Sequence, residues 1–288
     1  MKTNIKIIFA VACVYLCSAA FSFSQTKPSP SPSSSPLVKR TTYKSEKIDF
    51  GAGGTVTIVG APAGSITIEG WQKNEIEVQA EIEIQAGSEA DLAQLAQVNG
   101  FLLDEDFGHA RIVSVGTHDR DYMKRVAKKF PKQLLGTPFK IDFRIKVPIY
   151  CDLEINGGKG DLTLSAVEGA MLIKFLESNA RLDLTGGAVD ATFGTGSVDV
   201  KIAKPSWRGR QLSVGLASGT LNVRFPQNLS ADLDASILKT GKIESSLENL
   251  KPRERAKFSE KSIIARAGNG GALLSFTVGD GALKLSNW

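Results

Sequence analysis

The chain has 288 residues, of which 35 are Lys or Arg and 30 are Asp or Glu, so its formal net charge at pH 7 is +5. A balance this mild does not indicate a polyanionic partner, and no nucleic-acid-binding motif accompanies it. Cysteine occurs at Cys13, Cys17 and Cys151. Only the last lies outside the N-terminal segment, which excludes an internal disulfide framework for the rest of the chain.

Residues 1–24 are predicted to be a secretory signal peptide. Two lysines precede the apolar stretch Ile7–Phe21, and small residues lead to a cleavage site between Ser24 and Gln25. The apolar stretch is short for a membrane-spanning helix, and no later stretch would span a bilayer. We therefore expect export to the periplasm, the cell envelope or the exterior. An uncleaved anchor and a lipidated N-terminal cysteine are the alternatives.

Residues 25–46 are predicted to be a linker. The run Thr26–Pro36 reads TKPSPSPSSSP, and proline and serine at this density favour an extended, solvated tether. The folded domain is then expected to span residues 47–288.

A short pattern recurs along this domain. A glycine or another small residue is followed by any residue, then by an apolar, a polar and an apolar residue. The units open at Gly54, Gly64, Gly160, Ala180, Gly196, Gly219, Gly241 and Gly281. Alternation of period two places the two apolar side chains on one face of a strand. The predicted core positions are Val56, Ile58, Ile66, Ile68, Leu162, Leu164, Leu182, Leu184, Val198, Val200, Leu221, Val223, Leu283 and Leu285.

Strands this short need neighbours, because the burial of two side chains, worth about 3–6 kcal/mol, roughly offsets the entropy cost of ordering one unit. From Gly160 the small residues step by 20, 16, 23 and 22 residues, with weaker strands between them. This pattern favours an all-β fold in which successive coils stack: a single-stranded, right-handed β-solenoid resembling a parallel β-helix. A β-sandwich is the alternative, since its strands are also short and closely spaced.

Residues 87–137 interrupt the pattern and are expected to form a small helical insertion. Ser88–Val98 has a capping serine and leucines at helical spacing. Asp119–Leu135 carries Tyr122, Val126 and Phe130 one turn apart, with several lysines and arginines that could touch an anionic surface.

No catalytic, cofactor-binding or metal-binding residue is predicted. His109 and His118 lie near acidic residues but lack the spacing of a metal motif. The run Gly157–Asp161 resembles a calcium-binding glycine–aspartate repeat, but it has no tandem copy. Cys151 is expected to be a small core residue. The three tryptophans are too scattered to define a sugar-stacking platform.

Carboxylates on the outward face leave an enzymatic function as an alternative hypothesis. Asp183 and Asp199 are the best candidates for a pair on successive coils, as a polysaccharide-active enzyme would require. A solvated sheet face accounts for them equally well.

Three stretches resemble the bacterial "putative adhesin" family of domains of unknown function. They are Gly64–Val78, which includes Trp71, the return strand ending at Pro148, and the run Gly270–Leu285. The resemblance covers about residues 48–285. It implies a β-solenoid envelope or surface protein and brings no catalytic residues with it.

The sequence thus predicts a non-catalytic, exported protein that presents a polar sheet face to a glycan or protein ligand at the cell surface. A polysaccharide-active β-helix enzyme and a self-assembling envelope scaffold are the alternatives. The sequence does not identify the ligand or the oligomeric state.

Overall fold

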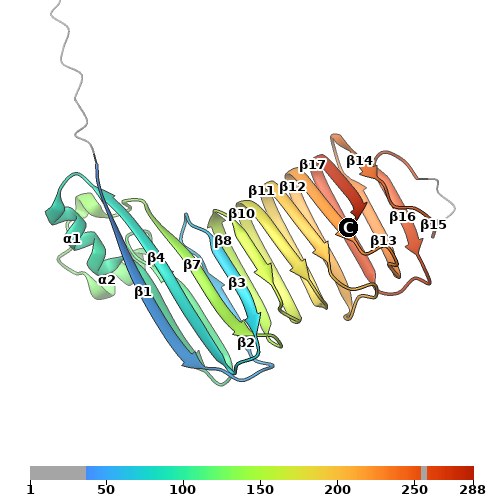
Figure 1. The fold of residues 1–288 in the computed structure, drawn as a ribbon. Helices are drawn as coiled ribbons and strands as arrows, with labels where there is room; N and C mark the ends of the chain where they lie inside the picture. Colours follow the sequence, from blue (N-terminus) through green and yellow to red (C-terminus); the bar gives the residue numbers. More distant parts are fainter. Residues whose placement is uncertain (1–36, 254–257) are drawn as a thin grey trace, which may run out of the picture. The chain divides into compact units, whose positions relative to one another are not determined.

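The computed structural model describes residues 37–253 and 258–288, and the predicted signal peptide with its cleavage site between Ser24 and Gln25 lies outside them. Within these residues the fold is all-β, as predicted, and its strands belong to one large mixed sheet that does not close on itself (Figure 1). The strands are β1 (Val38–Asp49), β2 (Thr55–Val59), β3 (Ile66–Trp71), β4 (Glu75–Ala86), β5 (Gly100–Asp106), β6 (His109–Val115), β7 (Phe139–Pro148), β8 (Asp152–Lys159), β9 (Leu162–Ser165), β10 (Gly169–Leu184), β11 (Gly187–Ile202), β12 (Gln211–Phe225), β13 (Ala231–Ile237), β14 (Gly241–Ser245), β15 (Lys251–Pro252), β16 (Ser262–Ala267) and β17 (Leu273–Asn287).

The long strands β10, β11, β12 and β17 lie side by side and run parallel (Figure 1). Ile173 of β10 pairs with Ile155 of β8 on one side and with Ala191 of β11 on the other, a step of 18 residues each time. In-register stacking of this kind places apolar residues above apolar residues, so their side chains form one continuous interior. Every apolar position singled out in the repeat units is buried, with at most 2% of its surface exposed: Val56, Ile58, Ile66, Ile68, Leu162, Leu164, Leu182, Leu184, Val198, Val200, Leu221, Val223, Leu283 and Leu285.

One repeat unit is in a different phase from the predicted one. Leu182 pairs with Leu164 and Val200, so Ser178, and not Ala180, occupies the position of the leading glycine. A pattern of period two is unchanged by a shift of two residues, and the sequence alone therefore could not fix this alignment.

Three of the leading glycines, Gly196, Gly219 and Gly281, lie inside long strands and do not open new ones, whereas Gly241 opens β14. Gly196 lies within β11 with φ +133°, and a Cβ there would come within 2.0 Å of the carbonyl oxygen of Ser178 on β10. The equivalent Gly219 and Gly281 stack above it in register. Glycine at this column lets neighbouring backbones approach each other where the strands bend.

The last strands are not arranged in the sheet in chain order, although the steps between the repeat units favoured stacking of successive coils. Gly219 pairs with Gly281 of the C-terminal strand β17, and Gly241 of β14 lies on the far side of β17. The reason is the apolar content of the two strands. β17 buries five large side chains, whereas β14 buries only Ile243 and suits an outer position.

At the N-terminal side the sheet is largely antiparallel. β4 pairs antiparallel with both β1 and β7, β5 pairs antiparallel with β6, and β3 joins β7 to the parallel stack. The predicted linker 25–46 is wrong from Val38 onward, because β1 begins there and pairs with β4 along its whole length. No side chain of β1 is fully buried, so backbone hydrogen bonds hold the strand, and these leave no hydrophobic pattern in the sequence.

The predicted helical insertion contains two short α-helices and a strand pair. Helix α1 (Glu89–Val98) matches the expectation, with Ser88 Oγ accepting a hydrogen bond from the Asp91 N–H at 3.1 Å. The second expected helix is much shorter: α2 covers only Arg120–Val126, and a single 3₁₀ turn follows at Lys132–Leu134. Ala127 leaves the helical conformation, with φ −135° and ψ 55°, and so ends the helix before Pro131, which restricts only the residue that precedes it.

Candidate binding surface

A row of polar side chains crosses ten strands of the sheet at one register position. Cross-strand pairing joins each member to the next, from β1 at one side to β14 at the other. We call it the polar row, and its residues in spatial order are Ser45, Gln79, Arg144, Thr67, Thr163, Arg181, Asp199, Asn222, Lys284 and Glu244. Each is at least partly exposed, and all except Ser45 and Glu244, at the two ends of the row, lie between buried apolar neighbours along their strands. The alternation that builds the core thus also builds an outward polar surface.

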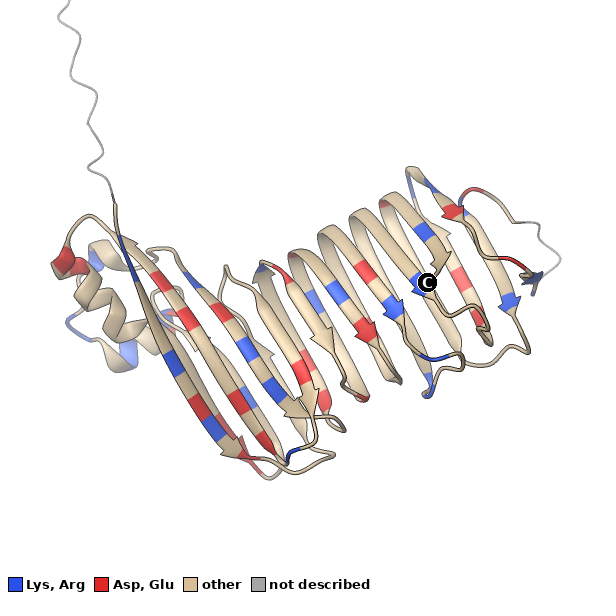
Figure 2. Ribbon diagram, viewed as in Figure 1, with Lys and Arg blue, Asp and Glu red and all other residues tan. Residues whose placement is uncertain are grey.

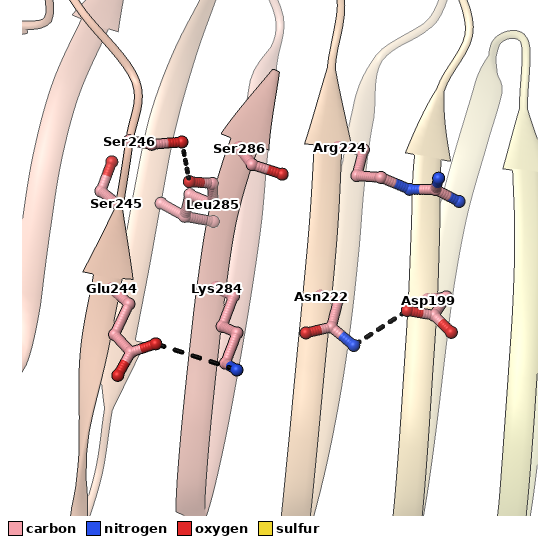
Figure 3. Close-up of a pocket in the computed structure, with 9 residues that line it drawn as sticks. All are labelled: Asp199, Asn222, Arg224, Glu244, Ser245, Ser246, Lys284, Leu285 and Ser286. Carbon is pink, nitrogen blue, oxygen red and sulfur yellow. Dashed lines mark hydrogen bonds and ion pairs between the residues drawn. The ribbon is translucent and has the colours of Figure 1, made fainter. Parts of the chain in front are cut away.

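The β11–β14 end of the polar row forms an open groove of about 650 Å³. Asn222 Nδ2 donates a hydrogen bond to Asp199 Oδ1 at 2.9 Å, and Lys284 Nζ lies 3.9 Å from Glu244 Oε2 (Figure 3). Arg224 and Ser286 pair in the next row along the same strands and complete one wall. The groove therefore offers both donors and acceptors at the regular spacing of neighbouring strands.

Charges of opposite sign alternate across this groove. Figure 2 shows lysine, arginine and acidic positions on adjacent strands of the stack. Lys242 Nζ lies 2.8 Å from Glu244 Oε1, and this hydrogen bond, with the charges of Lys242 and Lys284, lowers the pKa of Glu244. Glu244 is thereby held as a carboxylate, which accepts hydrogen bonds and does not act as a proton donor.

An aromatic side chain lies beside the groove, two residues after Ser286. Trp288 is half exposed, with Lys201 Nζ 4.7 Å from its ring centroid, and its indole N–H donates to the carbonyl of Ile202 at 3.2 Å. Trp71 and Trp207 also donate their indole N–H groups to nearby backbone carbonyls, and Trp207 is buried. Trp288 could not be separated from the other two tryptophans by sequence, because its position depends on the placement of β17.

The other end of the polar row contains a second hollow of about 430 Å³, lined by Ser45, Thr67, Gln79 and Arg144 among others. Asp142 is fixed at its side, since its Oδ1 accepts hydrogen bonds from both the N–H and the hydroxyl of Ser65 at 2.7 Å. Burial acts to raise the pKa of Asp142, but hydrogen bonds from Lys140 and Ser65 outweigh it and the net effect lowers the pKa. This carboxylate is therefore also ionised.

The predicted stacking of Asp183 on Asp199 is wrong. The 18-residue register places Asp183 beside Lys201 and Asp199 beside Arg181. Asp183 Oδ2 lies 3.7 Å from Lys201 Nζ. Each carboxylate therefore faces a cation on the neighbouring strand, an arrangement that favours ion pairing over shared acid–base chemistry.

The histidines do not converge. His109 Nε2 is hydrogen-bonded to Thr57 Oγ1 at 2.7 Å, whereas His118 packs on the ring of Phe139, and partial burial there lowers its pKa. Among the described residues, no three His, Cys, Asp or Glu side chains come together in a way that could hold a metal ion.

The remaining candidates have structural roles. A Cβ at Gly157 would meet the ring of Phe175 at 2.1 Å, so close packing explains this glycine. Cys151 is buried, and this burial, with the nearby charge of Asp152, raises its pKa to about 12, which keeps the thiol protonated and unreactive.

Comparison with known proteins gives a limited result. No family model matches the chain, and no curated protein matches it. A solved "putative cell adhesion protein" from Clostridium sporogenes aligns at 12% identity over 86% of this chain and 100% of its own, with a TM-score of 0.45. Two solved proteins each named "putative adhesin" align at 8% identity. The Bacteroides fragilis protein covers 86% of this chain and 97% of its own (TM-score 0.32), and the Parabacteroides merdae protein covers 84% and 95% (TM-score 0.30).

Similarity at this level does not establish family or function. In the part of the chain that the structure describes, neither helix has the length and apolar character needed to cross a membrane.

Proposed function

We propose that the protein is an exported, non-catalytic binding protein whose polar row binds an extended glycan at the cell surface. The observation that carries this proposal is the continuous register of ten polar side chains from Ser45 to Glu244. Neighbouring strands lie about 4.8 Å apart, so the row is about 43 Å long and suits a polymer better than a small molecule.

The rigidity of the stack supports binding. Side chains on a hydrogen-bonded sheet are held in place before a ligand arrives, which reduces the entropy cost of binding. Trp288 adds an apolar ring beside the polar groove, and recognition sites commonly combine an aromatic surface with convergent polar groups.

The cations that lie next to the acidic groups favour binding over catalysis. Asp183, Asp199 and Glu244 each lie beside a cation on a neighbouring strand. A glycosidase needs one carboxylic acid with a raised pKa as proton donor, whereas the pKa of Glu244 is lowered.

Further parts of the proposal concern architecture and compartment. We infer that the parallel stack is a right-handed β-solenoid and that the chain belongs to the "putative adhesin" family. The 18-residue steps and the column containing Ser178, Gly196 and Gly219 support the solenoid, and parallel crossovers are almost always right-handed.

Export would follow from cleavage between Ser24 and Gln25, and N-terminal sequencing of the protein recovered from cell fractions tests it.

A glycan array tests the binding proposal directly. The mature wild type is compared with a variant carrying Arg181→Ala, Asn222→Ala and Lys284→Ala. The matched control carries Lys174→Ala and Asp190→Ala, which lie on β10 and β11 before the glycine column and outside the polar row. We expect the row variant alone to lose binding. Equal binding by all three proteins, or release of cleaved sugars from a bound glycan, would overturn the proposal.

A further inference from the structure

A further cavity lies beside α2, and none of its lining residues belongs to the polar row. Its volume is about 770 Å³, within the range of small-molecule sites. It is lined by Thr117, His118, Arg120, Met123, Lys124, Ala127, Lys128, Phe130, Lys132, Leu135 and Gly136.

The segment that forms this cavity is closed at its base. The N–H of Gly136 donates to the carbonyl of Thr117 at 3.1 Å, and the hydroxyl of Thr117 donates to the carbonyl of Thr137 at 2.8 Å. Thr117 is fixed in turn, because its N–H donates to Asn99 Oδ1 at 2.9 Å. These hydrogen bonds fix both ends of the loop between Thr117 and Gly136, so the cavity is formed before a ligand binds.

Part of the cavity lining is apolar. Met123 is 4% exposed, and Phe130 and Ala127 are partly buried. Leu135 is 48% exposed although it lines the cavity, so a ligand there would cover apolar surface that now faces water. The buried residue of α2 is thus Met123, whereas Val126 of the predicted apolar stripe is 56% exposed.

The lining is also cationic. Arg120, Lys124, Lys128 and Lys132 all line the cavity, and no acidic residue does. Lys124 pairs with Asp121 at 2.9 Å, but no carboxylate among the described residues lies within 4.0 Å of the other three cations. A cluster of unpaired cations beside an apolar wall attracts an anionic group.

We propose that this cavity binds an anionic amphiphile, whose alkyl chain packs on Met123, Phe130 and Leu135 while the cations hold its carboxylate or phosphate head group. A neutral lipid would leave the cations without a partner. A small inorganic anion would leave the apolar wall exposed. Only a molecule with both parts matches both the apolar and the cationic residues of the lining.

The test measures binding of a fluorescent long-chain fatty acid to the full chain. Its arms are the corresponding alkyl phosphate, the uncharged alcohol, inorganic phosphate, and vesicles of anionic phospholipid. We expect the carboxylate, the phosphate or both to bind one molecule per chain, and the alcohol at least about tenfold more weakly, a difference of about 1.4 kcal/mol.

Matched variants locate the site. Lys128→Glu and Leu135→Asp should each weaken binding about tenfold. Lys129→Glu, next in sequence but outside the cavity, and Leu176→Asp, an exposed leucine on β10, should leave it unchanged. Unfolding curves confirm that each variant folds. The proposal is overturned by equal loss in Lys128→Glu and Lys129→Glu, by equal binding of the alcohol, or by binding to vesicles alone.

Discussion

Ser178 on β10 lies beside Gly196 on β11, at the position that glycine occupies on β11, β12 and β17. It is 3% exposed, and its hydroxyl has no hydrogen-bond partner among the described residues. Its backbone does not have the positive φ of its glycine neighbours, so a side chain is tolerated there without strain. The column thus contains one buried polar atom whose desolvation is not compensated.

We predict that Ser178→Ala stabilises the protein. Removing an unpaired buried hydroxyl relieves a desolvation cost, and the expected gain in the free energy of unfolding is about 1 kcal/mol. Chemical denaturation with an unchanged m-value measures it. Ser197→Ala, at a partly exposed neighbouring position on β11, serves as control and should change stability by less than about 0.5 kcal/mol. A loss of stability in Ser178→Ala would mean that the hydroxyl has a partner, such as an ordered water.

Gly196→Ala should have the opposite effect. The new Cβ would lie 2.0 Å from the Ser178 carbonyl oxygen on backbone with φ +133°, so one strand must move or strain. We expect a loss of at least about 2 kcal/mol. Gly215→Ala on β12 is the matched control, because its Cβ would meet nothing closer than 3.9 Å. Similar stability of the two variants would contradict a close-contact role for the glycine column.

The repeat unit of β10 illustrates what could be predicted from the sequence and what could not. Period-two alternation separates the two faces of a strand, so Leu182 is buried and Arg181 faces outward. The alternation does not fix the register between strands, because moving the repeat unit that opens at Ala180 by two residues along its strand preserves the pattern. Register depends on backbone pairing between distant residues.

The same limit applies to the candidate site. The alternation in the repeat units places Asp199, Asn222, Lys284 and Glu244 at outward positions, but their alignment in one row depends on β17 lying between β12 and β14. The contributions of β1, β4 and β7 could not be predicted either, since their pairing is antiparallel and lies outside the repeat pattern.

Acid should reduce the stabilising effect of Asp232. Its Oδ1 accepts a hydrogen bond from Arg266 Nε at 2.9 Å, Arg253 lies 3.5 Å from Oδ2, and the hydrogen bond with Arg266 lowers the pKa of Asp232. A lowered carboxyl pKa contributes stability above the unfolded-state pKa of about 3.9, and this is lost as pH falls through the folded-state pKa.

We therefore expect Asp232→Asn to cost about 1 kcal/mol at neutral pH and progressively less below about pH 4. Unfolding curves of wild type and variant across that range give the difference. Asp234→Asn on the same strand is the control, since Asp234 has no ion pair among the described residues. A difference that stays constant down to the lowest pH would rule out the ion pairs as its cause.

The start of β1 predicts a sharp boundary for truncation. A chain that begins at Leu37 keeps the pairing of β1 with β4 from Val38 to Asp49, whereas a chain that begins at Lys47 loses most of it. The second truncation uncovers the edge of a twelve-residue strand with buried Ile82 and Ile84, and a long uncovered edge invites pairing with another chain. We expect light scattering to detect concentration-dependent association in the shorter chain only. If both chains are equally monomeric and equally stable, the pairing of β1 with β4 contributes little to stability. Residues 38–46 would then act as part of the linker although they form a strand.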